Sequence, residues 1–136
     1  MLRSTAVTLL LASTTTLATA GPVPKEDLLA PPESATRYMI VSETNTHGDE
    51  WRWVTEDGDI AFRKSQSLRG WITETDARVR VDGTGNIQAL EIRGVTPSGD
   101  AAETFVVEDG RARWDSGADQ GEVKAGDAFY LSRGGP

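Results

Sequence analysis

Apolar and polar side chains alternate along most of the chain between residues 38 and 114. This alternation is typical of antiparallel β-strands that bury one face. The longest alternation runs from Leu68 to Val81. One face there carries Trp71, Thr73, Thr75, Ala77, Val79 and Val81, and the other carries Ile72, Glu74, Asp76, Arg78 and Arg80. We expect the first face to point into a core and the charged face to point into solvent.

Turn-forming residues divide the alternating segments into hairpins. Asp109-Gly110 lies between two β-rich runs, which is a strong signal for a tight hairpin. Pro97-Ser98-Gly99 reverses the chain, because Pro97 fixes φ and Gly99 tolerates a positive φ. The segment from Ile92 to Trp114 is therefore predicted to form three strands of a meander, around which the other strands pair.

These patterns predict an all-β fold. We expect an antiparallel meander of about seven or eight strands, forming a curved sheet or a partly open barrel after an N-terminal signal helix. No segment beyond residue 20 shows a sustained helical period. We assign residues 36–131 to this β domain.

The first twenty residues have the pattern of a secretory signal peptide. Arg3 supplies a positive charge, residues 6–12 are mostly apolar, and Ala18-Thr19-Ala20 is a small-residue cleavage site. The apolar run is too short for a membrane span of about 20 residues. The sequence thus predicts a periplasmic or secreted protein with no membrane span after cleavage.

The segments that flank the predicted β domain are rich in turn residues. Residues 21–35 contain four prolines, which disfavour both helices and sheet ladders, so we predict an extended Pro-rich linker. Residues 132–136 end in Gly-Gly-Pro and are interpreted as a C-terminal tail or a truncated linker.

Charge and composition narrow the function classes. The net charge is −7 and the basic residues are scattered, which disfavours binding to nucleic acid or to an anionic membrane. Cysteine is absent, which excludes a disulfide, a thiolate nucleophile and a cysteine-ligated metal.

The sequence offers few candidates for catalysis. His47 is the only histidine, and its Gly and Asp neighbours predict an exposed turn. Glu74 and Asp76 lie two residues apart, as a glycosidase carboxylate pair could, but Arg78 and Arg80 favour a solvated charged face. We therefore predict no catalytic, cofactor-binding or metal-binding residue, and no cofactor, in this chain.

The four tryptophans allow two interpretations. Trp51, Trp53, Trp71 and Trp114 could line a pocket for a sugar or lipid inside a curved sheet. In a domain this small, tryptophans more often form the core, because each aromatic side chain buries about 150–250 Å².

Several segments resemble the N-terminal β domain that precedes the catalytic barrel in some exported bacterial amidohydrolases. The segments that carry this resemblance are 67–75, 93–105, 110–114, Ala118-Asp119, Gly121-Glu122, Tyr130-Leu131 and Gly134-Gly135-Pro136. The resemblance implies a parent activity of metal-dependent hydrolysis, performed by a (β/α)₈ barrel through an H-x-H pair and further ligands. This chain has one histidine and no H-x-H pair, so no catalytic residue can be transferred to it.

Two functions follow as hypotheses. In the first, the chain is a non-catalytic accessory β domain, either a fragment or a stand-alone relative, whose partner is an amidohydrolase barrel in cis or in trans. In the second, it is an independent periplasmic module that binds a small ligand. An enzyme acting by itself is a third hypothesis, for which the sequence shows no constellation of catalytic residues.

Overall fold

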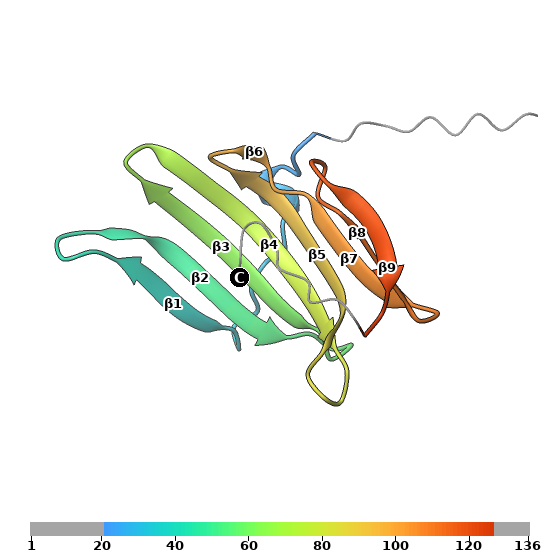
Figure 1. Cartoon of the computed structure of the whole chain (residues 1–136). Coiled ribbons are helices and arrows are strands. Elements are labelled where there is room, and N and C mark those ends of the chain that lie inside the picture. The colour runs from blue at the N-terminus through green and yellow to red at the C-terminus, as the bar shows by residue number, and fades with distance from the viewer. Residues whose placement is uncertain (1–20, 127–136) are drawn as a thin grey trace, which may run out of the picture.

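The computed structural model describes residues 21–126, which form one open antiparallel sheet (Figure 1). The strands are β1 (Thr36–Val41), β2 (Thr46–Val54), β3 (Ile60–Leu68), β4 (Trp71–Val81), β5 (Ile87–Thr96), β6 (Gly99–Asp100), β7 (Glu103–Glu108), β8 (Arg111–Asp115) and β9 (Gln120–Lys124). A short 3₁₀ helix, η1 (Lys25–Asp27), precedes them. The predicted all-β, antiparallel class is confirmed.

The sheet is a meander with one small branch. Its order is β1-β2-β3-β4-β5-β7-β8-β9, and β6 pairs with the end of β5. The described residues thus form nine strands where seven or eight were expected, because the reversal at Pro97-Ser98-Gly99 adds the two-residue β6. The predicted signal helix at residues 1–20 and the predicted tail at residues 132–136 lie outside the described residues.

One face of the sheet, which we call the core face, holds the main apolar cluster. Strand register aligns Val79, Leu90, Phe105 and Trp114 in one row across β4, β5, β7 and β8. Leu90, Phe105 and Ala112 are buried there, and five half-buried apolar side chains pack against them. The alternation in the sequence thus locates this cluster, because every member falls on the same side of its strand.

The opposite face, which we call the strap face, is crossed by the N-terminal strap, residues 25–29. The strap contains η1, buries the Leu28 side chain and contacts β4 through Lys25 and Leu29. Figure 1 shows this segment, in blue, running behind the sheet. The Pro-rich segment is therefore not only an extended linker, since part of it packs on the domain.

The strap explains why the prediction for the charged face of β4 was wrong. Glu74 and Asp76 were expected in solvent, but they are 8% and 2% exposed. The strap covers both carboxylates, and arginines from β3 and β5 pair with them. In contrast, Trp71, expected to point into the core, is 61% exposed at the start of β4.

Within residues 21–126, no helix is long and apolar enough to cross a membrane.

Candidate functional site

A polar cavity of about 210 Å³ lies on the core face, between the middle of the sheet and the segment 96–103. Three charged side chains line it: Lys64 from β3, Asp100 from β6 and Glu103 from β7. The remaining lining residues are hydroxyl-bearing or apolar, namely Thr73, Thr75, Ile92, Thr96, Ser98, Ala101, Ala102 and Ser116. The cavity therefore combines charges of both signs with hydroxyl groups, and no aromatic side chain of residues 21–126 lines it.

Strand register shows how the sheet builds the cavity floor. Lys64 pairs with Thr75 on β4, and Thr75 pairs with Gly94 on β5. Gly94 has a φ of +115°, and a Cβ atom there would lie 2.1 Å from the carbonyl oxygen of Glu74. Only glycine fits such a close approach of two strands. Gly94 thus lets β4 and β5 approach closely beside Thr75 and Ile92, two residues that line the cavity.

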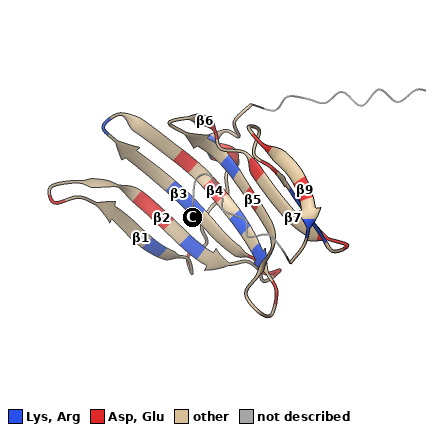
Figure 2. Cartoon of the chain, viewed as in Figure 1, with Lys and Arg blue, Asp and Glu red and all other residues tan. Residues whose placement is uncertain are grey.

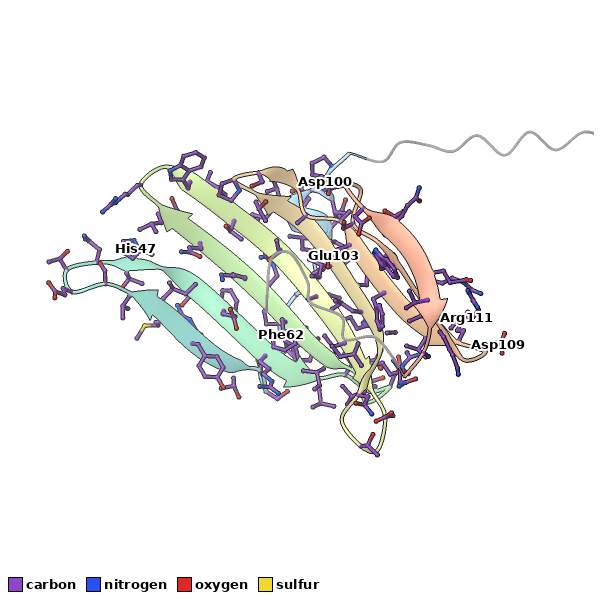
Figure 3. The ribbon with its side chains drawn as sticks, viewed as in Figure 1. His47, Phe62, Asp100, Glu103, Asp109 and Arg111 are labelled. Atoms are coloured by element: carbon purple, nitrogen blue, oxygen red, sulfur yellow. The ribbon has the colours of Figure 1, made fainter. Side chains whose placement is uncertain are left out.

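The segment 96–103 is held against the sheet by hydrogen bonds of its own. The amide of Ala101 donates to the carbonyl oxygen of Gly94 at 3.0 Å. The Asp100 carboxylate accepts a hydrogen bond from the amide of Ala102 at 2.9 Å, through Oδ1. These bonds fix the acidic side of the cavity, where Figure 3 labels Asp100 and Glu103.

Lys64 supplies the positive charge at the other side of the cavity. Its Nζ lies 4.0 Å from a carboxylate oxygen of Glu50, the residue opposite it on β2. This distance is longer than a hydrogen bond, so the pair is a weak ion pair. The Lys64 ammonium group has three donors, and its contact with Glu50 does not fix its direction.

A second cluster of charges lies on the strap face and joins the strap to three strands. Figure 2 shows acidic and basic segments side by side across β3, β4 and β5. Glu74 accepts hydrogen bonds from Lys25 at 2.7 Å, from Ser65 at 2.6 Å and from Arg63 at 2.5 Å. Burial raises the pKa of Glu74, but these hydrogen bonds outweigh burial and hold the pKa below its usual value.

Asp76 ties the strap to β5. Its carboxylate accepts two hydrogen bonds from the Arg93 guanidinium, one of them at 3.0 Å to Oδ1. It also accepts one from the backbone amide of Leu29 at 2.6 Å. Burial of the Glu74 and Asp76 carboxylates would be costly without partners. Their cations and the Leu29 N–H group offset this cost. We interpret this cluster as structural.

Asp59, just before β3, and Arg80, near the end of β4, form another such pair. The guanidinium donates two hydrogen bonds to the carboxylate, at 2.9 and 3.0 Å. The hydrogen bond from Arg80 lowers the pKa of the nearly buried Asp59.

The four tryptophans are not brought together. Trp51 and Trp53 pair with Arg63 and Ala61, which places them on the strap face, and Arg37 lies 5.9 Å from the ring centre of Trp51. Trp71 and Trp114 fall on the core face, but on β4 and β8, and neither lines the polar cavity. The structure therefore divides the predicted tryptophan pocket between two faces.

His47, expected in an exposed turn, lies at the beginning of β2 and is half-buried. Its Nε2 atom is 2.9 Å from the hydroxyl oxygen of Ser42. Among residues 21–126, no group of three or more His, Asp or Glu side chains is placed to hold a metal ion.

Sequence reasoning missed the polar cavity. Two signals pointed to it: a glycine inside the β5 pattern, and threonines at positions 73 and 75 on the face expected to be apolar. Their meeting with Asp100 and Glu103 depends on the β5–β7 pairing, which local patterns do not specify.

No family model matches the chain, and comparisons with curated proteins and with solved structures find no match either.

Proposed function

We propose that the chain is a non-catalytic accessory β domain that docks on a metal-dependent amidohydrolase barrel, in cis or in trans, in an exported protein. The resemblance described above suggests this class of partner. The segments that carry it are mainly strands and turns, such as the β3–β4 hairpin and the β5–β6–β7 reversal. We therefore assign these segments a structural role in the domain and not a catalytic one.

The observation that carries the proposal is the exposure of apolar side chains on edge strand β1. Met39 and Val41 are 66% and 60% exposed. Tyr38, on the opposite face of β1 from Met39, is also more than half exposed. Within the described residues β1 pairs only with β2, so its outer edge presents unpaired backbone groups beside exposed apolar side chains. Such a surface favours burial against another protein.

The two ends of the sheet offer a matched comparison. The other edge strand, β9, is more polar, with the sequence QGEVK, and its one large apolar side chain, Val123, is 37% exposed. A charge at Met39 would be buried in the proposed interface, whereas a charge at Val123 would remain in solvent. Met39→Lys and Val123→Lys therefore separate docking through β1 from a general effect of surface charge.

The test is a binding titration of the full chain with a purified (β/α)₈ barrel of an exported metal-dependent amidohydrolase from the same organism. We expect binding that Met39→Lys weakens about tenfold or more, because a charge then sits in an apolar interface. Val123→Lys should leave the affinity unchanged. Equal effects of both substitutions, failure to bind the barrel, or amide hydrolysis by the purified chain alone would overturn the proposal.

The polar cavity favours a second candidate function, a module that binds a small ligand. Its volume is below the range of about 300–1,000 Å³ that is typical of sites for drug-sized ligands. The ligand would therefore be small. This site replaces the tryptophan pocket that the sequence suggested.

A further inference from the structure

We infer that the tip of the β3–β4 hairpin, residues 67–72, inserts into the headgroup layer of a zwitterionic phospholipid surface. We call this tip the finger. Its cation, Arg69, meets a lipid phosphate, and its three large apolar side chains reach the boundary with the acyl chains. None of its residues belongs to β1 or lines the polar cavity. The inference is therefore independent of both functions proposed above.

The finger extends past the strands on both sides of it. Its two halves pair with each other across the turn. Pairing of β3 with β2 stops at Gln66, and pairing of β4 with β5 starts at Glu74. Within residues 21–126, the finger therefore pairs only with itself, and all six of its residues are exposed. It is a two-stranded ribbon at one end of the sheet, where Figure 1 shows the β3–β4 turn.

Apolar side chains stand on both faces of the finger. Leu68 and Trp71 lie opposite each other on the core face and are 38% and 61% exposed. Ile72 lies on the strap face and is 55% exposed. Tryptophan is enriched where membranes meet water, because its ring is apolar and its N–H group is polar. A lipid layer surrounds whatever enters it, so apolar exposure on both faces favours lipid over a protein surface that covers one face.

The charge of the finger suits a lipid phosphate. Arg69 is its one charged residue, and among residues 21–126 no hydrogen bond or ion pair occupies the guanidinium. A guanidinium binds phosphate oxygens through two parallel hydrogen bonds. The segment 60–73 contains no acidic residue, although the whole chain has 21 acidic and 14 basic residues. The finger is thus a locally basic point on an acidic protein.

The rest of the protein selects a zwitterionic surface over an anionic one. Glu43 lies in the β1–β2 turn, which Figure 2 shows in red, while the β3–β4 turn is blue. Together with the net charge of −7, this carboxylate disfavours a surface rich in anionic lipids. Phosphatidylcholine offers the phosphate without a net negative charge.

The turn holds the finger in shape before it meets lipid. Arg69 and Gly70 have φ values of +53° and +82°, the pattern of a type I′ hairpin turn. This turn keeps Leu68 and Trp71 side by side in the free protein. Insertion therefore requires little ordering of the backbone, which favours binding by so small a surface.

The experiment adds phosphatidylcholine vesicles to the full chain and follows flotation and tryptophan emission. We expect the chain to float with the vesicles and its emission to move to shorter wavelength, because Trp71 leaves water. Trp71→Phe should still float but lose this shift, since Trp51, Trp53 and Trp114 are already half-buried. Absence of flotation, or a shift that persists in Trp71→Phe, would overturn the inference.

Apolar variants locate the contact. Leu68→Ser and Ile72→Ser should each lower the vesicle partition coefficient about tenfold, because each removes apolar surface from the lipid. Val54→Ser is the matched control: Val54 is 69% exposed but pairs with Ile60, at the opposite end of β3. It should leave partition unchanged. An equal loss in the control, or no loss in the two finger variants, would show that another part of the chain binds the vesicles.

Charge variants test the phosphate contact. Arg69→Glu should lower partition about tenfold, because it replaces the group that binds phosphate. Lys124→Glu, on β9, changes the net charge by the same amount and should have no effect. Met39→Lys, on β1, should also have none. A loss with Met39→Lys equal to that with Arg69→Glu would assign the lipid contact to β1 and contradict the inference.

The amidohydrolase barrel provides the last comparison. Vesicle binding without binding to the barrel would refute docking through β1 and retain the finger. Protection of residues 67–72 from hydrogen exchange by the barrel, without vesicle binding, would make the finger a protein contact and refute its insertion into lipid.

Discussion

Replacing Gly94 by alanine tests the close approach of β4 and β5 beside the polar cavity. Gly94 has a φ of +115°, and its Cβ would lie 2.1 Å from the Glu74 carbonyl oxygen and 2.9 Å from the Thr75 Cα atom. Both contacts are to backbone, which cannot rotate away as a side chain can. The β4 and β5 strands must therefore separate locally to admit the methyl group.

The expected loss of stability has two parts. An alanine at positive φ costs about 1–2 kcal/mol. Forcing packed atoms apart adds about 1–3 kcal/mol. We therefore expect Gly94→Ala to lower the free energy of unfolding by about 2–5 kcal/mol, a large fraction of the 5–15 kcal/mol typical of a domain.

Gly70→Ala is the matched control. Gly70 also has a positive φ, +82°, but a Cβ there meets no atom within 4 Å. It should lose only the backbone part, about 1–2 kcal/mol. Urea unfolding followed by tryptophan fluorescence measures both variants. Equal losses for the two substitutions would refute the claim that β4 and β5 approach closely at Gly94.

Three further predictions follow from the hydrogen bonds. Asp76→Ala leaves the Arg93 guanidinium without its buried acceptor and should cost about 3 kcal/mol in urea unfolding; a loss below about 1 kcal/mol would contradict the strap-face cluster. Hydrogen bonds from Thr84 and Asn86 lower the pKa of Asp82 from 3.8 to about 2. The stabilisation by Asp82 should therefore be complete above about pH 4 and lost as the pH falls through about 2. A carboxyl titration by NMR with its midpoint near 3.8 would disprove this. Trp114→Phe removes the donor that lies 3.0 Å from Asp119 Oδ2 and should cost about 1 kcal/mol by the same unfolding assay; no loss would show that this bond does not stabilise the end of the sheet.

The strand pattern could be predicted from sequence because alternation and turn chemistry are local. The Asp109-Gly110 turn joins β7 and β8 as expected. The meander order follows from short connections between successive strands.

The burial of Glu74 and Asp76 could not be predicted in this way. A strand with alternating charges normally has a solvated face, and nothing near β4 in the sequence indicates a cover. The cover comes from residues 25–29, more than forty positions earlier. Prolines around the strap suggested a linker, but a 3₁₀ turn with one buried leucine is enough to dock it.

Placing a candidate site from the sequence was harder still. The sequence suggested a pocket lined by the four tryptophans. The alternation of side chains along the strands instead puts Trp51 and Trp53 on the face opposite to Trp71 and Trp114. The charges of the cavity come from β3, β6 and β7, and only the pairing of distant strands brings them near one another. Local patterns contain no information about that pairing.

Hydrogen exchange of the backbone amides tests the central claim, docking through edge strand β1, most directly. The chain is measured alone and with a saturating amount of the amidohydrolase barrel. The account predicts slower exchange along Thr36–Val41 when the barrel is present, and unchanged exchange along Gln120–Lys124. Unchanged exchange in β1, or protection confined to β9, would contradict it.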